Sequence, residues 1–311
     1  MTVEVIIPTY KPGEEFREVL FRLSRQSVLP GRIHVINTEE KYWDPSWEKE
    51  FPLVDVTHIS RDEFDHGGTR RVAAAECRED FFVLMTQDAV PCHRDLLSQL
   101  IAPLIRDERI GAVYARQRPK RGSSPIEKYT REFNYPEESH VRFAEDIAQY
   151  GIKTFYCSNV CAAYRKSSYI AAGGFPERAI FNEDMIIARR ILEAGFGIAY
   201  AADAEVYHSH DYSSAEQFHR NFDIGVSHAE NPEIFGGIVS EGEGIRLVGM
   251  TADHLLSSGK WYMLPHLIIM SGCKYIGYLL GRHYRQLPAP FVRFCAMNKE
   301  YHYSQSRDCY V

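Results

Sequence analysis

An acidic residue, Asp88, follows a run of five apolar residues, Phe81–Met85, and stands just before Pro91. Five apolar residues bounded by polar ones predict a strand that is buried on both faces, and Pro91 prevents its simple continuation. Open α/β sheets bind their ligands outside the carboxyl ends of the strands. Asp88 is therefore a candidate for a metal or phosphate-linked site, and the alternative is an aspartate that only shapes a turn.

Two adjacent acids, Glu183 and Asp184, follow Asn182 at the start of a predicted helix. Asparagine is a good N-cap, and the helix dipole favours ionised carboxylates in the first turn. An ionised carboxylate at such a place could accept the proton of an attacking hydroxyl group. The alternative is that the two acids only stabilise the start of the helix.

Two histidines, His208 and His210, stand in a segment that reads as extended. Alternate side chains of an extended segment point the same way, so the two imidazoles could converge on one ion. A histidine pair of this kind is more often structural. The metal interpretation gains weight here because Asp88 offers a carboxylate.

The run Gly67-Gly68-Thr69-Arg70-Arg71 precedes a helix predicted over residues 72–79. Glycines and a threonine at a helix start expose backbone N–H groups, and the paired arginines add positive charge. That arrangement suits a phosphate or another anion. The alternative is a capped helix with solvated arginines.

All of these residues lie beside predicted strands. Strand, helix and strand in succession open a parallel α/β sheet, whereas the residues after 245 predict only helices. We therefore expect an α/β domain over residues 1–230 and a C-terminal helical extension over residues 231–311. The predicted strands cover residues 3–8, 32–37, 54–59, 81–85, 111–115, 154–157, 160–164, 198–200 and 204–207.

The composition is that of an ordinary folded protein of 311 residues, with 45% hydrophobic and 25% charged residues. The net charge of −6 argues against nucleic acid as a partner. The seven cysteines are scattered without zinc-site spacing, which predicts buried thiols in a reducing compartment. No signal-peptide pattern and no run of about 18 apolar residues is visible. We therefore expect a cytoplasmic protein without a spanning helix.

The last eighty residues carry an apolar helical surface bordered by basic side chains. Packing against the first domain or a homodimer contact is one interpretation of this surface, and peripheral contact with the inner face of a membrane is the other. The basic residues are Arg282, His283, Arg285, Arg293 and Lys299.

Short motifs stand in the order used by inverting family 2 glycosyltransferases, and the chain resembles that family over nearly its whole length. Thr86-Gln87-Asp88-Ala89 and three further runs resemble the bacterial rhamnosyltransferase branch of the family. The family motifs are Val5-Ile6-Ile7-Pro8-Thr9-Tyr10, Asp65-His66-Gly67-Gly68-Thr69-Arg70, Thr86-Gln87-Asp88-Ala89 and Asn182-Glu183-Asp184. The branch runs are Val206-Tyr207-His208-Ser209-His210, Phe222-Asp223-Ile224-Gly225-Val226 and Tyr278-Leu279-Leu280-Gly281.

The resemblance implies a nucleotide-sugar-binding domain of the GT-A type, in which a divalent metal ion (Mg²⁺ or Mn²⁺) bridges the donor diphosphate. By similarity, Asp88 would ligate the metal and His208 or His210 would complete its shell. Asp184 would be the catalytic base, and Glu183 would position the acceptor or the base. The donor would be bordered by Pro8, Thr9, Tyr10, Asp65, Gly68, Arg70 and Gln87.

Two departures from the family pattern change these expectations. The family often has an acidic cluster after its second strand, where this chain has Asn37-Thr38-Glu39-Glu40. Its metal motif usually carries two or three acids, whereas Thr86-Gln87-Asp88 carries one. We therefore expect weak metal binding, with the nucleotide supplying much of the coordination.

The prediction for function is transfer of a sugar, with inversion, from a nucleotide-diphosphate donor to a glycan or lipid-linked glycan acceptor. The resemblance favours L-rhamnose from dTDP-rhamnose. The alternatives are another UDP- or dTDP-hexose, or a non-catalytic nucleotide-sugar-binding protein. A nucleotidyltransferase is disfavoured because Tyr10-Lys11-Pro12-Gly13 is a poor match to its glycine-rich loop, and a dehydrogenase because no G-x-G-x-x-G follows a strand.

Overall fold

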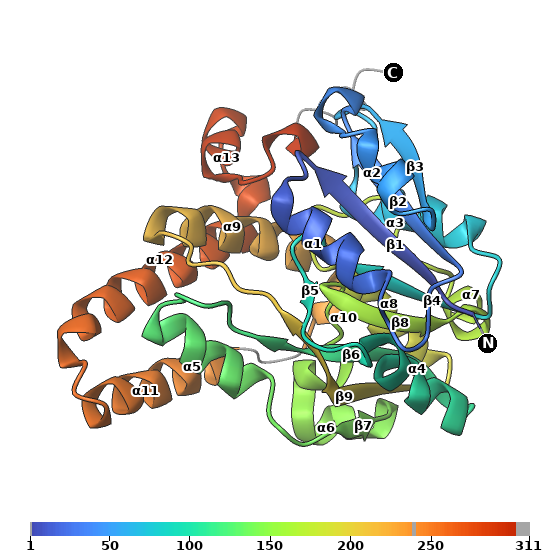
Figure 1. The fold of residues 1–311 in the computed structure, drawn as a ribbon. Helices are drawn as coiled ribbons and strands as arrows, with labels where there is room; N and C mark the ends of the chain where they lie inside the picture. The colour runs from blue at the N-terminus through green and yellow to red at the C-terminus, as the bar shows by residue number, and fades with distance from the viewer. Residues whose placement is uncertain (1, 238–240, 303–311) are drawn as a thin grey trace. The chain divides into compact units, whose positions relative to one another are not determined.

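The computed structural model describes residues 2–237 and 241–302, and these form two compact units (Figure 1). The predicted boundary at residue 230 differs from the observed one, because the helix after residue 213 belongs to the second unit. The first unit takes its described residues from 1–121, 134–177 and 183–209, and the second from 122–133, 178–182 and 210–311.

The first unit is built on one nine-stranded sheet in the order β3-β2-β1-β4-β8-β6-β9-β5, with β7 paired to β9 (Figure 1). Six strands run in one direction, and only β5, β7 and β8 run against them. The predicted mainly parallel α/β class is therefore confirmed. The strands are β1 (Glu4–Tyr10), β2 (Arg32–Thr38), β3 (Val54–Ile59), β4 (Phe81–Met85), β5 (Val90–Pro91), β6 (Ile110–Arg118), β7 (His140–Arg142), β8 (Cys161–Arg165) and β9 (Gly197–Tyr207).

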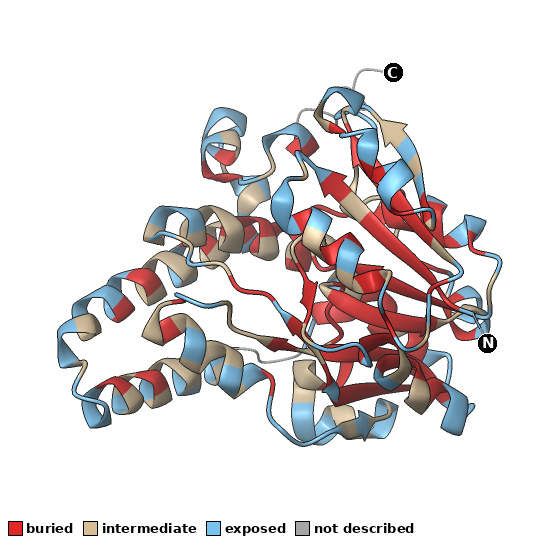
Figure 2. Cartoon of the chain, viewed as in Figure 1, coloured by how far each residue is buried: buried red, intermediate tan, exposed pale blue. Residues whose placement is uncertain are grey.

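The sheet is buried along most of its strands (Figure 2), and all five residues of β4 are buried, as their apolar run predicts. Trp43 and Trp47 pack edge to face with ring centroids 5.1 Å apart, which anchors the segment after β2 in the same core. The helices of this unit are α1 (Glu14–Leu23), α2 (Ser46–Glu50), α3 (His66–Glu76), α4 (Leu96–Arg106), α6 (Ile147–Tyr150), α7 (Lys166–Ala171) and α8 (Glu183–Glu193), with 3₁₀ turns η1 (Glu40–Tyr42), η2 (Ala144–Asp146) and η3 (Gly151–Phe155).

Three predicted elements differ from the structure. Residues 154–157 do not form a strand. Thr154 and Phe155 belong to the 3₁₀ turn η3, and both side chains are buried there. A short apolar run cannot distinguish these two outcomes. Helix α3 begins at His66 rather than at residue 72, because Asp65 caps it. The two short strands predicted over residues 198–207 are one strand, β9.

The described residues of the second unit form helices and their connections and no strand, and α9 lies along α12 within it (Figure 1). A capping box between Ser213 and Glu216 starts α9. The helices are α5 (Pro125–Asn134), α9 (Ser214–Glu230), α10 (Pro232–Phe235), α11 (Glu241–Ser257), α12 (Leu264–Arg282) and α13 (Ala289–Cys295), with 3₁₀ turns η4 (Trp261–Met263) and η5 (Tyr284–Gln286).

Glycines let α9 and α12 approach backbone to backbone. A Cβ atom added at Gly281 would overlap the carbonyl oxygen of Phe222, and one at Gly277 would overlap that of Phe218. Gly225 of α9 meets the backbone of Tyr278 in the same way. The runs after Phe222 and Tyr278 that resemble rhamnosyltransferases are thus a helix-packing device, and this contact places α9 in the helical unit.

Asp223 fixes the end of the chain that follows α13. Its carboxylate is 2% exposed and accepts the backbone N–H groups of Met297 at 3.3 Å and Asn298 at 2.8 Å. Burial, only partly offset by these two hydrogen bonds, raises the pKa of Asp223 to about 7. Asp223 therefore has a structural role in this unit.

The six described cysteines are free thiols, and four of them are buried, as the sequence predicts. From the sequence we expected no helix that could span a membrane, and one helical segment does meet the criteria of length and composition. The segment Trp261–Arg282 is long and apolar enough to cross a membrane. One such helix is weak evidence for a span, because core helices of soluble proteins pass the same test.

Candidate functional site

The carboxyl ends of β1, β4 and β9 lie at one edge of the sheet, because the strands run in the same direction. The side chain of Gln87, just after β4, holds the end of β1 by two hydrogen bonds. Its Oε1 accepts the backbone N–H of Tyr10 at 2.8 Å, and its Nε2 donates to the Tyr10 carbonyl at 3.1 Å. Gln87 is therefore fixed beside the predicted donor site.

Asp88 and His208, from turns 120 positions apart, meet at this edge. The Nε2 atom of His208 lies 3.4 Å from Oδ2 of Asp88. On the other side of the ring, Nδ1 lies 2.9 Å from Oε1 of Gln117. An amide oxygen only accepts, so Nδ1 carries a proton, and in the neutral ring the lone pair of Nε2 faces the carboxylate.

This pair fits a divalent cation by its donor chemistry. Two neighbouring ligands of an ion with bonds of about 2.1 Å lie roughly 3 Å apart, close to the 3.4 Å between Asp88 and His208. The contact from Gln117 fixes the ring orientation, as outer-shell partners of metal-binding histidines do. The ammonium of Lys120, whose Nζ lies 3.7 Å from the same oxygen of Asp88, has its closer ion pair with Glu15, at 2.5 Å.

His210 belongs to the second unit, where its ring stacks on that of Tyr212 with centroids 5.1 Å apart. Asp88, His208 and His210 carry the oxygen and nitrogen atoms that could hold a metal ion. Two residues of extended chain span about 7 Å. Chain connectivity thus keeps His210 within reach of an ion bound at His208.

The predicted base and ribose region centres on Tyr10. Its ring is 39% exposed and stands edge-on to Tyr42, with centroids 5.7 Å apart. The cations of Lys11 and Arg61 lie 5.2 and 5.9 Å from its centre. An exposed aromatic face beside cations suits a nucleobase and its phosphates.

The two residues before Tyr10 belong to β1. Thr9 is buried and donates its hydroxyl to Oδ1 of Asn37 at 3.1 Å, which joins the ends of β1 and β2. Pro8, paired with Ile36 in the register, is partly exposed within the same strand. Both residues therefore lie near the carboxyl end of β1, and their contact with the donor nucleoside stays a prediction.

The start of α3 is closed by its own aspartate. Oδ1 of Asp65 accepts the N–H groups of Gly67 at 2.8 Å and Gly68 at 2.9 Å. The expectation that these amides are open to an anion is thus corrected, because an N-cap aspartate competes for the same donors. Close packing requires a glycine at position 68, because an added Cβ would lie 2.6 Å from the carbonyl oxygen of Glu177.

Arg70 lies with the acid pair. It is 6% exposed, its Nη1 donates to the carbonyl of His66 at 2.9 Å, and its Nε lies 3.3 Å from Oε1 of Glu183. The same oxygen of Glu183 accepts Nδ2 of Asn159 at 3.2 Å. Glu183 is therefore a buried, ion-paired carboxylate.

Asp184 differs from its neighbour. It is partly exposed, and its carboxylate accepts the backbone N–H groups of Asn159 at 3.2 Å and Met185 at 2.8 Å. Burial of the carboxyl group, together with the charge of Glu183, raises the pKa of Asp184 to about 7. Burial also opposes ionisation of Glu183, but Arg70, His66 and Asn159 hold the pKa of that group below its usual value. Asp184 is thus the acid suited to proton transfer near neutral pH.

Three uncharged residues that the sequence analysis missed connect the Asp88–His208 pair with the Glu183–Asp184 pair. Gln117 bonds to His208, and its Nε2 donates to Oγ of Ser158 at 3.0 Å. The next residue, Asn159, bonds to both acids. The available signal was a polar Ser-Asn pair between two apolar runs, directly before β8.

Comparison with known families and proteins gives one consistent result. Residues 2–222 match the family described as "Glycosyltransferase like family 2". The chain is 36% identical over 316 residues to the O-antigen chain rhamnosyltransferase RfbN of Salmonella typhimurium, covering 99% of both chains. It is 37% identical over 313 residues to the O-antigen chain rhamnosyltransferase WbaN of Salmonella anatum, covering 98% of both.

Solved structures share the fold at lower identity. The mannosyltransferase PcManGT from Pyrobaculum calidifontis, in complex with GDP-Man and Mn²⁺, matches with a TM-score of 0.55 at 19% identity, covering 98% of this chain and 85% of that one. Residues 1–349 of S. aureus TarS match with a TM-score of 0.51 at 16% identity, covering 92% of each chain.

Proposed function

Because the chain belongs to glycosyltransferase family 2, we propose that this enzyme transfers L-rhamnose from dTDP-rhamnose to a glycan or lipid-linked glycan with inversion. Two rhamnosyltransferases of O-antigen chains that match it from end to end support this donor and a role in polysaccharide synthesis. The observation that carries the mechanism is the contrast between buried, paired Glu183 and partly exposed Asp184.

Asp184 is the proposed base. Its carboxylate takes the proton of the acceptor hydroxyl while the hydroxyl oxygen bonds to the anomeric carbon of the donor. The bond from that carbon to the diphosphate breaks, and the diphosphate leaves with the electron pair. A single displacement needs one carboxylate and inverts the anomeric centre, whereas double displacement needs a second carboxylate as nucleophile.

Other residues orient Asp184 and keep its surroundings fixed. The Asn159 amide bonds to one of its carboxylate oxygens, and the Met185 amide bonds to the other. Glu183 stays charged beside Arg70, and its negative charge makes Asp184 a stronger base. We therefore assign Glu183, Arg70 and Asn159 as positioning residues.

Asp88 and His208 are the proposed holders of a divalent metal ion, with His210 as a third ligand. When bound, a hard cation neutralises the negative charge that grows on the departing diphosphate. The mannosyltransferase structure that shares the fold is a complex with GDP-Man and Mn²⁺. The carboxylate and imidazole at 3.4 Å support the same arrangement here.

The nucleotide is proposed to lie along the ends of β1 and β2. The exposed ring of Tyr10 would stack on the base, and Thr9, Pro8 and Gln87 would border the ribose. Asp65, Gly68 and Arg70 lie at the start of α3 or within it. Their proposed contribution is to fix the wall of the site.

The remaining partner proposals concern the helical unit. We propose a cytoplasmic enzyme that touches the inner face of a membrane through this unit, where a lipid-linked acceptor would be found. A homodimer through the same surface is the alternative. The exposed apolar side chains of α12 support a contact of one of these kinds.

A panel of nucleotide sugars tests the donor directly. We expect dTDP-rhamnose with Mn²⁺ or Mg²⁺ to raise the Tm more than UDP-glucose, dTDP-glucose or GDP-mannose, because a ligand that binds only the folded state stabilises it. Release of dTDP should then require an acceptor glycan. Equal stabilisation by all four donors would contradict the rhamnose assignment, and binding without release would favour a non-catalytic protein.

A further inference from the structure

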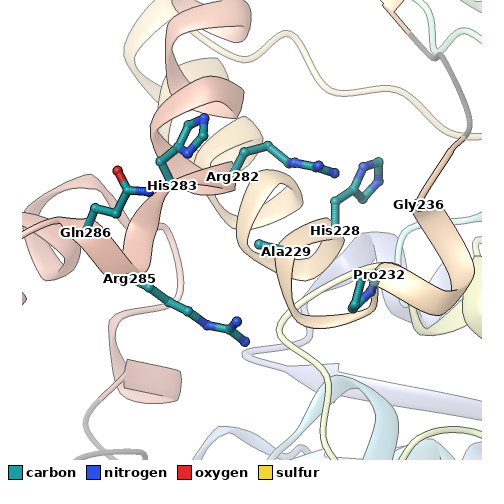
Figure 3. Close-up of a pocket in the computed structure, with 8 residues that line it drawn as sticks. All are labelled: His228, Ala229, Pro232, Gly236, Arg282, His283, Arg285 and Gln286. Atoms are coloured by element: carbon teal, nitrogen blue, oxygen red, sulfur yellow. The ribbon is translucent and has the colours of Figure 1, made fainter.

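The helical unit contains a basic pocket at the carboxyl ends of α9 and α12. Its volume is about 300 Å³, and Figure 3 shows Arg282 extending across it toward His228. Arg285, from η5, lines the same pocket, and none of the described residues that line it is acidic. The space is large enough for a phosphate group.

Neither arginine of this pocket forms an ion pair within 4 Å of a described carboxylate, and Glu230 acts on Arg285 only through its charge. Arg285 donates only to the hydroxyl of Tyr284, at 3.4 Å. Glu230, the acid near Arg285, accepts the hydroxyl groups of Tyr284 at 2.9 Å and Tyr301 at 2.7 Å. Guanidinium groups are permanently charged and match phosphate geometry. The pocket is thus built for an anion.

His228 gives the pocket a rigid, uncharged wall. Its ring stacks on Phe235 with centroids 4.0 Å apart, and Nδ1 lies 3.1 Å from the hydroxyl of Tyr278. Burial and the neighbouring charge of Arg282 lower the pKa of His228 to about 4. The permanent positive charge at neutral pH therefore comes from the arginines.

An apolar stripe on α12 ends at this pocket. Ile268, Tyr275 and Arg282 are spaced seven residues apart, so they share one face of the helix. The series Ile269, Ile276 and His283 runs beside it. The four apolar members are 54–67% exposed, and Trp261 and Tyr262 are exposed before the helix starts. The glycine face packed on α9 is on the opposite side. We call these six exposed apolar residues the α12 stripe.

The charge of this segment is opposite to that of the whole chain. Residues 254–299 contain six lysines and arginines and no aspartate or glutamate, whereas the chain carries a net charge of −6. Such clustering favours an anionic surface as the partner. A second copy of the chain would place these basic residues against one another, which like charges disfavour. A spanning position is disfavoured because α9, with Glu216, Arg220 and Asp223, covers the other side of α12.

We propose that the α12 stripe and the Arg282–Arg285 pocket bind an anionic phospholipid bilayer, with the stripe among the acyl chains and a lipid phosphate in the pocket. This proposal rests on the membrane contact proposed above, to which it adds the residues and the lipid group involved. It does not depend on which sugar is transferred. The helix lies in the interface plane, as amphipathic helices with basic edges do. The transferase would thereby be held where a lipid-linked acceptor is embedded.

Vesicle flotation of the full-length protein tests the proposal. We expect binding to phosphatidylcholine vesicles that contain phosphatidylglycerol and little binding to phosphatidylcholine alone. A basic residue near an anionic surface contributes about fivefold to binding, so R282Q/R285Q should bind roughly twentyfold more weakly. I268S/I276S should also lose binding. R25Q/R106Q, which removes the same charge from exposed sites of the first unit, should bind like the wild type.

Two controls separate this proposal from the function. All variants should keep the wild-type Tm, and R282Q/R285Q should transfer sugar to a water-soluble acceptor at the wild-type rate. Wild-type vesicle binding by R282Q/R285Q, or no wild-type binding to the anionic vesicles, would overturn the lipid proposal. So would self-association that I268S/I276S abolishes in a protein that ignores vesicles. Vesicle binding by a protein that transfers no rhamnose would instead refute only the donor assignment.

Discussion

Two helix starts in the first unit use acids in opposite ways. At the start of α3, the carboxylate of Asp65 accepts hydrogen bonds from two backbone N–H groups of its own helix. At the start of α8, Glu183 is neutralised by Arg70, whereas Asp184 is partly exposed with a pKa near 7. The sequences of the two starts look equally suited to function. Backbone N–H groups bond to both carboxylates, so the difference is that burial and the charge of Glu183 oppose the ionisation of Asp184.

The largest expected effect comes from removing the proposed base. Asp184→Asn should lower turnover at least a hundredfold, because positioned proton transfer contributes about 10²–10⁴-fold. Donor affinity, measured by calorimetry, should stay near that of the wild type. The matched control is Asp65→Asn, because asparagine caps a helix as well as aspartate does. Equal losses of turnover in the two variants would remove the distinction between the two helix starts.

The metal proposal predicts the next effect. Asp88→Ala and His208→Ala should each weaken donor binding about tenfold or more when Mn²⁺ is present. Removal of the ion with a chelator should weaken the wild type by a similar factor and leave the variants unchanged. Titrations in which the variants match the wild type both with and without Mn²⁺ would exclude these residues as ligands.

The pH dependence of the rate sharpens the contrast between Glu183 and Asp184. Because Asp184 must be ionised to accept a proton, kcat/KM should rise with pH through about 7 and then level off. Glu183→Gln removes the neighbouring negative charge, so the rise should move to lower pH. A wild-type rate that is constant from about pH 5 to pH 8 would show that no group of this pKa limits the reaction.

Stability should follow the opposite trend with pH. The pKa of Asp184 is about 7 in the folded protein and near 3.8 without perturbation, so the folded state binds the proton more tightly. The contribution of protonated Asp184 to the free energy of unfolding is fully present below about pH 4 and is lost as pH rises through about 7. Asp184→Asn should therefore exceed the wild type in unfolding free energy by a few kcal/mol at about pH 8. Denaturant titrations at both pH values measure this, and a constant difference would contradict the raised pKa.

The smallest expected effect concerns the cap of α3. Asp65→Ala should cost about 1 kcal/mol of unfolding free energy, because two helix amides lose their acceptor. Asp65→Asn should recover most of that loss. If the alanine variant were as stable as the wild type in denaturant unfolding, Asp65 would have no capping role.

The sequence predicted the strand that leads to Asp88, because its five apolar residues are bounded by polar ones and followed closely by Pro91. It also suggested that Asp88 and His208 meet, since both follow strands of one sheet. Gln117, Ser158 and Asn159 were missed because their partners are far away in the chain. Periodicity reports which way a side chain faces, and it does not identify the distant neighbour of an uncharged amide or hydroxyl group.

The hydrophobic pattern of the sequence also could not predict the boundary between the two units. The amphipathic pattern of α9 shows that one face is buried, but not whether a sheet or another helix covers it. The signal was present in Gly277 and Gly281, which are spaced one helical turn apart and face α9. Small residues at that spacing permit close helix packing, and the partner becomes evident only with coordinates.

A direct titration of the Asp184 carboxyl group tests the central claim. Infrared difference spectra between the wild type and Asp184→Asn isolate the absorption of this one group as pH is varied. The account predicts a protonated carboxyl band that disappears with a midpoint near pH 7. A group that is already fully ionised at about pH 5, like an ordinary aspartate, would contradict it.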